Sequence, residues 1–376
     1  MVIAGVLKHA RPFVPAHFLG VASTGAIGID FGTERVNLVQ VARLGGECRI
    51  HAAASLPYDR EREALLDAPL ELKRLLRHAF AERPFRGRKV IASVPPSIVE
   101  MLVINYRCES PTDEVAAIVR ATEERLGGSI AARVVDYLPI ARGNDGNGRA
   151  ALVAVADHDA VVGYLEALRK CSLDVVALEV GPIAIQRLIA EIDKDAASTV
   201  VAITFGTVKS FVTVLSNGQL LLDRDIDFGT RAVVSRLGDA LDCTPAEALD
   251  LLQRHGLALS RSVDATHDAA DPAAGIKSAL SEILKPQFIA LAKDVLRIRD
   301  YVAAETRGSA GKIYAFGSLA RWPNADRLLS SLCGVEISSI NPFYGLDVAE
   351  GATDMSDIGP ISGVAVATGL ALRETT

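Results

Sequence analysis

The fold is decided by residues 27–41, which read Ile-Gly-Ile-Asp-Phe-Gly-Thr-Glu-Arg-Val-Asn-Leu-Val-Gln-Val. Apolar residues alternate with small or polar ones up to Phe31, and a second apolar run follows. Asp30, Gly32 and Thr33 fall at the bend between the two runs, which predicts a β-hairpin with a polar turn. Such a turn can direct backbone N–H groups at a phosphate, with the carboxylate near a bound Mg²⁺. An ordinary hairpin with a polar tip is the alternative, because short motifs often match by chance.

Length and composition indicate a globular chain with more than one domain. The 376 residues predict two or three domains or lobes, at roughly 100 to 200 residues per domain. Hydrophobic residues make up 49% of the chain but aromatic residues only 5%, so the cores are expected to be aliphatic. The formal net charge of -6 argues against nucleic acid as a partner, because such proteins normally carry a basic face. The five cysteines form no CxxC pair, which argues against a disulfide framework or a zinc site.

Residues 1–25 form an apolar-leaning arm that charged residues interrupt. No uninterrupted apolar run in this arm is long enough to cross a bilayer. A signal peptide is not expected, because the charges fall inside the part that should be apolar. We predict a flexible tail here. An arm that touches a partner or a membrane surface is the alternative.

A second strand–bend–strand–turn–strand unit begins near residue 200. Thr199–Thr204 and Ser210–Leu215 are predicted strands on either side of the bend Gly206-Thr207. Asn217-Gly218 then turns the chain into a third strand. The unit that begins near residue 27 has the same order. The repetition predicts two lobes of related build with a cleft between them.

Three turns follow apolar strands, and their order resembles that of a known superfamily. They are Asp30-Phe31-Gly32-Thr33, Thr204-Phe205-Gly206-Thr207 and Phe316-Gly317-Ser318. This order is similar to the phosphate, phosphate and adenosine motifs of the actin/DnaK-type ATPases.

More narrowly, the chain resembles the PilM type IV pilus assembly proteins. Their first turn has the form Asp-Ile-Gly-Ser-Ser-Ser-Val-Lys, and residues 30–37 here read Asp-Phe-Gly-Thr-Glu-Arg-Val-Asn. They carry Arg-Glu-Ile-Pro-Phe-Gly before a helix, and residues 224–229 read Arg-Asp-Ile-Asp-Phe-Gly. Residues 341–343, Asn-Pro-Phe, and residues 369–373, Gly-Leu-Ala-Leu-Arg, are also similar. The resemblance covers about residues 26–373.

The resemblance implies an α/β protein of the actin-like ATPase fold. It implies two lobes, each with a mixed five-stranded sheet and flanking helices, and ATP between them. The implied division is an N-terminal arm (1–25), the first lobe (26–95 and 155–197), a small subdomain inserted into it (96–154), the second lobe (198–230 and 295–344), a helical subdomain of the second lobe (231–294), and a C-terminal helix that returns to the first lobe (345–376).

The resemblance also implies which residues surround ATP, or ADP, with Mg²⁺. Asp30 is the expected metal-site acid. The residues expected to contact the nucleotide are Asp30, Gly32, Thr33, Glu34 and Asn37 of the first turn, Gly206, Thr207 and Lys209 of the second, and Gly317 and Ser318 of the third. Plain turn roles for the threonines and a solvated surface role for Lys209 are the alternatives.

Departures from the family pattern fall on the chemistry. Asn37 replaces a lysine, so a positive charge near the phosphates is lost. Thr204 replaces an aspartate, and a hydroxyl is a weaker Mg²⁺ ligand than a carboxylate. Phe316 is bulky, so it either obstructs a nucleotide base or stacks on it. Phosphoryl transfer relies on positioned metal and positive charge. We therefore expect a weak or inactive ATPase and assign no catalytic residue.

The resemblance implies a cytoplasmic scaffold peripheral to the inner membrane. It would bind the cytoplasmic tail of a PilN-like inner-membrane protein in the first lobe, near the inserted subdomain. Other pilus assembly-platform components and self-association are further expected contacts, and nucleotide would be a structural ligand or switch. The alternatives are a small-molecule kinase or active ATPase on the same fold, a GspL-type domain of a type II secretion platform, and an FtsA-like filament protein. The last two would carry a membrane helix after the fold.

Overall fold

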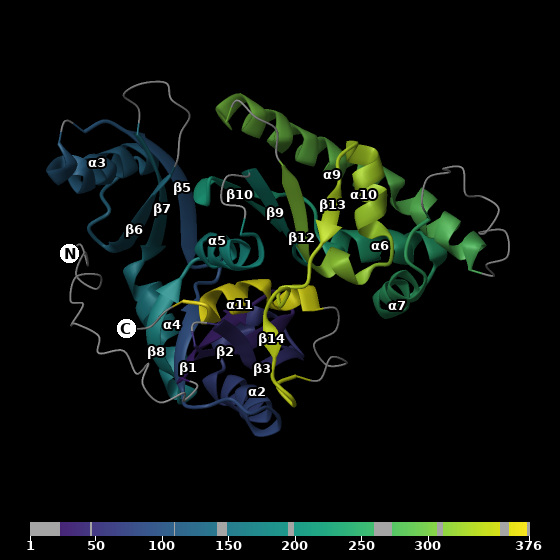
Figure 1. Cartoon of the computed structure of the whole chain (residues 1–376), viewed down its shortest axis with the longest axis horizontal. Helices are drawn as coiled ribbons and strands as arrows, with labels where there is room; N and C mark the ends of the chain where they lie inside the picture. Colours follow the sequence, from purple (N-terminus) through teal and green to yellow (C-terminus); the bar gives the residue numbers. More distant parts are fainter. Residues whose placement is uncertain are drawn as a thin grey trace.

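The computed structural model describes residues 23–45, 47–108, 110–140, 149–194, 199–258, 273–306, 311–353 and 361–373. These residues are arranged around three sheets, with helices packed on the two larger ones (Figure 1). The sequence also predicts loops at 143–148 and 261–271. These two loops and most of the predicted arm 1–25 lie outside the described residues.

The first sheet has the order β14-β3-β2-β1-β4-β8. Its strands are β1 (Ser23–Phe31), β2 (Arg35–Leu44), β3 (Glu47–Pro57), β4 (Lys89–Ser93), β8 (Asp174–Glu179) and β14 (Asp347–Val348). The predicted hairpin is the antiparallel pair β1–β2, while β4 lies parallel to β1 and β8 parallel to β4. Five strands were predicted for this lobe, and a sixth, β14, extends the sheet because residues 347 and 348 return along the edge of β3.

The second sheet has the five predicted strands in the order β11-β10-β9-β12-β13. They are β9 (Thr199–Phe205), β10 (Ser210–Ser216), β11 (Gln219–Ile226), β12 (Lys312–Gly317) and β13 (Ile337–Ser339). An antiparallel meander followed by a parallel strand therefore builds both large sheets. The predicted repetition of one strand unit in two lobes is confirmed.

A smaller sheet of order β5-β7-β6 lies between β4 and α4 in the sequence. Its elements are β5 (Val99–Tyr106), η1 (Pro111–Asp113), α3 (Glu114–Leu126), β6 (Arg133–Ile140) and β7 (Arg149–Asp157). The sequence of residues 112–126 predicts an amphipathic helix with Thr112 as its N-terminal cap, and this cap is wrong. The Thr112 hydroxyl lies 2.7 Å from that of Ser110, and Thr112 belongs to the 3-10 turn that precedes α3.

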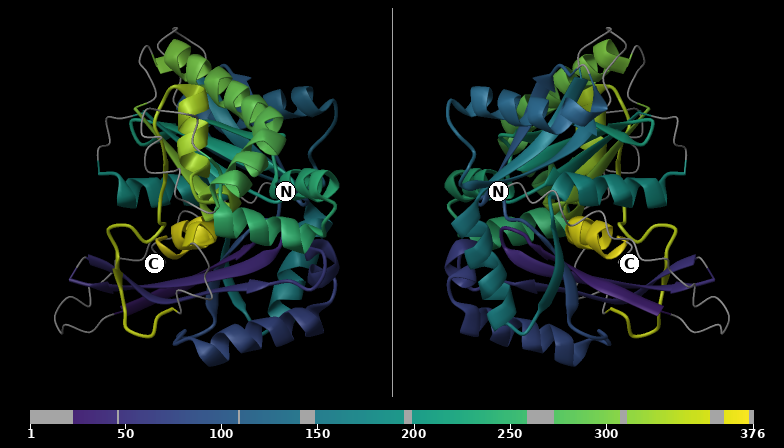
Figure 2. Two further views of the ribbon diagram at one scale, coloured as in Figure 1. Left: turned by 90° about the vertical axis from the view of Figure 1, so that its right-hand side faces the viewer. Right: turned by 90° about the vertical axis from the view of Figure 1, so that its left-hand side faces the viewer.

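Helices cover both faces of the first sheet. They are α1 (Arg62–Leu66), α2 (Pro69–Glu82), α4 (His158–Lys170), α5 (Gly181–Ile192) and α11 (Ala365–Ala371), which the short turn η3 (Ile361–Val364) precedes. Figure 2 shows α2 beneath the strands and α11 above them. Leu72 and Leu76 of α2 share a buried core with Tyr164 and Leu168 of α4 on the lower face.

The second lobe carries the remaining helices of the described residues. They are α6 (Thr230–Leu241), α7 (Pro245–His255), α9 (Ala274–Thr306), η2 (Ser318–Arg321) and α10 (Ala325–Cys333). The sequence predicts that Thr244 caps α7 and that Pro245 is its first residue. This cap is confirmed, because Thr244 and Glu247 form a reciprocal capping box. The long helix α9 continues through Pro286.

One buried apolar cluster joins all three sheets. It contains Val39 of β2, Ile140 of β6 and Ala202 of β9, together with residues of α5 and α11. The two lobes and the smaller sheet therefore share a hydrophobic core, and α5 and α11 lie within it. The turns that end β1, β9 and β12 are positioned by this core.

Two glycines allow α11 to approach its neighbours closely. A Cβ atom on Gly28 of β1 would lie 2.1 Å from the carbonyl oxygen of Ala367. A Cβ atom on Gly369 of α11 would lie 2.0 Å from the carbonyl oxygen of Ala184 in α5. No side chain fits at such distances, so the backbones of β1, α11 and α5 are in direct contact.

Candidate functional site

The first turn is held by hydrogen bonds to the Asp30 carboxylate at the end of β1. The Ser93 hydroxyl at the end of β4 donates to Asp30 Oδ1 at 2.7 Å. The Asn37 amide donates to Asp30 Oδ2 at 3.4 Å, and its own oxygen accepts from the Ser55 hydroxyl at 2.7 Å. Asn37, at 5% exposure, is buried in this network. Asp30 and Asn37 therefore contact each other, and Gly32 lies at the same turn.

Burial is the main influence on the Asp30 carboxyl group. It raises the pKa of Asp30 above its ordinary value, against the hydrogen bonds from Ser93 and Asn37 and the charge of Arg62. The ionised carboxylate is therefore penalised by its surroundings, and a cation bound there would offset that penalty.

Two residues beside Asp30 were missed by the sequence analysis. Arg62 of α1 donates from Nη1 to the carbonyl oxygen of Phe31 at 3.4 Å, and its side chain is 12% exposed. The Tyr58 hydroxyl is buried and has no hydrogen-bond partner among the described residues. Burial and the negative charge of Asp30 both raise the pKa of Tyr58. No motif marks either position, because both come from the segment after β3.

The second and third turns are packed against each other. Gly317 has a φ of 89°, and a Cβ atom there would lie 2.1 Å from the Phe205 carbonyl oxygen. The Ser318 hydroxyl donates to that oxygen at 3.3 Å and accepts from the Thr230 hydroxyl at 2.5 Å. The backbone N–H of Thr230 donates to the carbonyl oxygen of Gly206 at 3.1 Å. Gly206, Gly317 and Ser318 are therefore brought together at the start of α6.

Thr207 belongs to the same group of contacts. It is buried at 7% exposure, and its carbonyl oxygen accepts from the N–H of Arg231 at 2.9 Å. Lys209 is directed elsewhere, because its ammonium group pairs with Asp225 on β11 at 2.6 Å. About half of each of these two side chains is exposed, so the pair contributes little to stability.

Asp223 is a perturbed carboxyl group near this pair. It lies two residues before Asp225 on β11 and accepts from the Thr213 hydroxyl at 2.8 Å. Burial, and to a smaller extent the negative charge of Asp225, raise the pKa of Asp223 to about 7, against the hydrogen bond from Thr213.

Asp223→Asn is expected to raise the free energy of unfolding at pH 8 by about 2 kcal/mol, with little change at pH 4. The folded-state pKa lies above the ordinary value of 3.8. Between these values the folded protein holds a proton that the unfolded chain releases, so stability falls as pH rises through this window. Urea unfolding of both proteins at several pH values measures the effect. A difference that does not change with pH would contradict it.

One pair of opposite charges connects the first turn with the segment that follows the third turn. Glu34 is exposed at the tip of the first turn, and its negative charge acts on Arg321 at the end of η2. Burial lowers the pKa of Arg321, and its Nε has no hydrogen-bond partner among the described residues. Among the predicted site residues, Glu34 therefore makes an electrostatic interaction with Arg321 of the other lobe.

Phe316 and Glu179 have structural roles. Phe316 is fully buried in the cluster that α5 and α11 share, so the predictions that it obstructs or stacks on a base are wrong.

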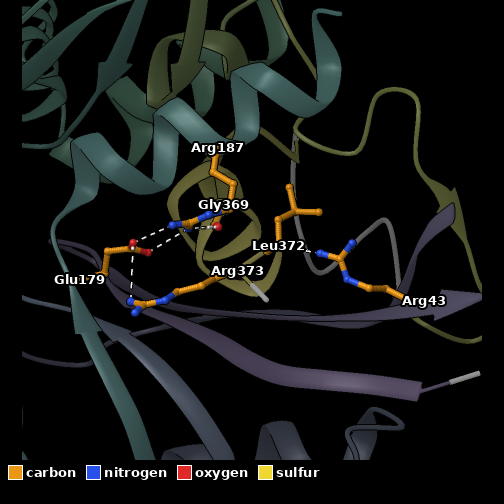
Figure 3. Close-up of polar contacts among 6 residues, drawn as sticks. All are labelled: Arg43, Glu179, Arg187, Gly369, Leu372 and Arg373. Carbon is orange, nitrogen blue, oxygen red and sulfur yellow. Dashed lines mark hydrogen bonds and ion pairs between the residues drawn. The ribbon is translucent and has the colours of Figure 1, made fainter. Parts of the chain in front are cut away.

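Figure 3 shows Glu179 at the end of β8 facing Arg187 of α5 and Arg373. Arg187 binds the Glu179 carboxylate through two nitrogens, at 2.7 and 2.9 Å, and donates to the Gly369 carbonyl oxygen at 2.7 Å.

The residues present fit a nucleotide with Mg²⁺ in several respects. The described residues offer no acceptor to the backbone N–H groups of Thr33 and Thr207, at the tips of the first two turns. Unpaired N–H groups at such turns are suited to phosphate oxygens. In the part of the chain that the structure describes, no three His, Cys, Asp or Glu side chains gather as a metal site. Asp30 alone would hold Mg²⁺, which proteins often bind through one carboxylate plus phosphate oxygens and water.

Comparisons with known proteins place the chain in a family. No helix in the described ranges is long and apolar enough to span a membrane. A comparison with curated protein sequences gives no significant match. A solved PilM–PilN type IV pilus biogenesis complex contains a chain that is 22% identical, with a TM-score of 0.70, over 93% of this chain and 98% of that one. The ethanolamine utilization protein EutJ from Carboxydothermus hydrogenoformans is 14% identical, with a TM-score of 0.50, over 96% and 91%.

Identities this low indicate a shared fold alone, and the predicted actin-like ATPase fold is confirmed. A family model described as type IV pilus assembly protein PilM matches residues 28–375. Because that match spans nearly the whole sequence, the chain belongs to the PilM family of type IV pilus assembly proteins.

Proposed function

We propose that this chain is a cytoplasmic scaffold for type IV pilus assembly that binds the tail of a PilN-like protein at the inner membrane. The observation that carries the proposal is the family match over residues 28–375. The similar chain in the solved PilM–PilN complex supports the choice of partner. The contact would lie in the first lobe near the predicted subdomain at 96–154, and other platform components and self-association are further proposed contacts.

Nucleotide is proposed as a structural ligand or switch. Asp30 would hold Mg²⁺, and the N–H groups of Thr33 and Thr207 would bind phosphate oxygens. The adenosine would lie near Gly317 and Ser318. Bound Mg²⁺ would supply the positive charge that polarises a phosphoryl group.

Weak or absent hydrolysis is expected from this chain's own residues. Asn37 is a neutral amide committed to Asp30 and Ser55. Lys209 is paired with Asp225 on the second lobe. Thr204, at the end of β9, offers a hydroxyl where a carboxylate would assist a metal. None of these three residues therefore supplies charge to stabilise the transition state of phosphoryl transfer.

Calorimetric titration with the cytoplasmic tail peptide of the PilN-like protein tests the scaffold. We expect saturable binding of one peptide per chain, with the affinity measured with and without Mg²⁺–ATP. A peptide of the same composition in scrambled order is the control and should not bind. No tail binding under any nucleotide condition would reject the scaffold function.

An active ATPase or small-molecule kinase is the second candidate. Arg62 beside Asp30 favours the enzyme, because the Arg62 guanidinium brings a positive charge to the first turn, where Asn37 replaces the lysine of the family pattern. Phosphate release from Mg²⁺–ATP, with and without candidate acceptors, distinguishes the two. Steady turnover that Asp30→Ala abolishes would establish the enzyme, whereas a raised melting temperature without turnover supports a ligand role.

A further inference from the structure

The first turn needs a cation if it is to bind phosphate groups, and Arg62 is placed to supply one. Asn37 at this turn is neutral, and Lys209 is paired with Asp225 in the second lobe. Arg62 at the start of α1 donates to the carbonyl oxygen of Phe31, the residue before Gly32. Its charge acts on Asp30, Tyr58 and Tyr164, so the guanidinium lies within the same buried polar region.

The surroundings hold the Arg62 guanidinium under the turn. Its side chain is 12% exposed and pairs with Glu63, whose side chain is 53% exposed. The hydrogen bond to Phe31 engages Nη1, and the contacts to Glu63 engage Nε and Nη2. A guanidinium has five N–H donors in a fixed plane, so these contacts leave donors for an anion.

An unpartnered polar atom lies in the same region. The Tyr58 hydroxyl is buried without a hydrogen-bond partner among the described residues, and the charges of Asp30 and Arg62 both act on it. Buried hydroxyl groups are normally hydrogen-bonded. A donor of this kind beside Arg62 is a second feature that suits the oxygens of an anionic ligand.

We propose that Arg62 is the cation that binds the phosphate groups of a nucleotide at the first turn. The proposal rests on the nucleotide role proposed above and names the residue that carries it. Arginine binds phosphate through two parallel N–H groups. Arg62 would therefore contribute to the affinity for the phosphate groups and not to the affinity for adenosine. The Asp30 carboxylate would remain available to hold Mg²⁺.

Affinities of the full chain for Mg²⁺–ATP, Mg²⁺–ADP, pyrophosphate and adenosine test the assignment. Arg62→Gln is expected to weaken ATP and pyrophosphate binding about 10- to 100-fold and to leave adenosine unchanged. Arg60→Gln is the matched control, because Arg60 lies two residues away and pairs with Glu71 at 2.6 Å. It should change none of the affinities.

A rescue variant distinguishes the loss of the Arg62 charge from a structural effect of Arg62→Gln. Asn37 Nδ2 lies 3.4 Å from Asp30, so a lysine at position 37 would bring an ammonium group to the same turn. Adding Asn37→Lys to Arg62→Gln is expected to restore most of the ATP affinity. If it restores none, or if Arg62→Gln weakens ATP and adenosine equally, the assignment is overturned.

Glu63→Gln keeps the test usable if Arg62→Gln does not fold. This variant retains Arg62 and removes its carboxylate partner, so ATP is expected to bind a few-fold more tightly and adenosine unchanged. Unchanged or weaker ATP binding would contradict the proposal. A wild-type chain that binds neither ATP nor pyrophosphate overturns both this assignment and the nucleotide role. The calorimetric titration with the tail peptide tests the scaffold function independently of nucleotide binding.

Discussion

Gly369→Ala is expected to destabilise the protein by about 3 kcal/mol or more. The added Cβ atom would lie 2.0 Å from the carbonyl oxygen and 2.5 Å from the carbonyl carbon of Ala184. Both atoms belong to the backbone of α5, so no side-chain rotation relieves the clash. The helices α5 and α11 would have to separate, and both line the core shared by the two lobes.

Gly163→Ala is the matched control for this prediction. Gly163 lies inside α4, and a Cβ atom there has no heavy atom within 4 Å. The same substitution is expected to stabilise the protein by about 0.5–1 kcal/mol through helix propensity. Denaturant unfolding of the three proteins measures both changes. Equal effects of the two substitutions would show that α11 and α5 are not in backbone contact.

Glu179→Ala is expected to cost about 3 kcal/mol of folding free energy. Its side chain is 9% exposed and pairs with Arg187 through two hydrogen bonds and with Arg373 at 3.7 Å (Figure 3). Removing the carboxylate deprives Arg187 and Arg373 of their anionic partner. Water replaces it poorly at Arg187, because that side chain is only 26% exposed. Arg187 also donates to the Gly369 carbonyl oxygen at the end of α11, so the loss reaches the junction of the lobes.

Glu282→Ala controls for the loss of an ordinary ion pair. Glu282 is 70% exposed and pairs with Lys285 on the same helix at 3.2 Å. Exposed pairs of this kind contribute about 0–1 kcal/mol, so the free energy of unfolding should change by less than that. Thermal and urea unfolding compare the two variants. If both change stability equally, the Glu179 cluster does not hold α11.

Local patterns in the sequence predicted the elements well. The alternation at residues 27–31 gives β1, because successive side chains of a strand face opposite sides. Thr244, Pro245 and Glu247 mark the start of α7 through hydrogen bonds within one turn. Such features depend only on neighbouring residues, so a single sequence contains them. The two-residue strand β14 has no pattern of its own and forms only because β3 offers an edge.

The candidate site was predicted only in part, since its contacts cross long stretches of sequence. Ser93 reaches Asp30 because β4 pairs with β1 in one register, with Ile29 opposite Ala92. Nothing in the residues around Ser93 specifies that register. Arg62 likewise follows β3 without a motif. The turn residues could be named in advance, but their charge partners depend on tertiary packing.

We propose that this chain binds a PilN-like tail through its first lobe. Hydrogen exchange of the full chain with and without the tail peptide tests it most directly. We expect slower exchange within residues 96–154 when the peptide is present, with the exchange of the second-lobe sheet unchanged. Exchange that is the same everywhere with a saturating peptide, or protection confined to the second lobe, would contradict it.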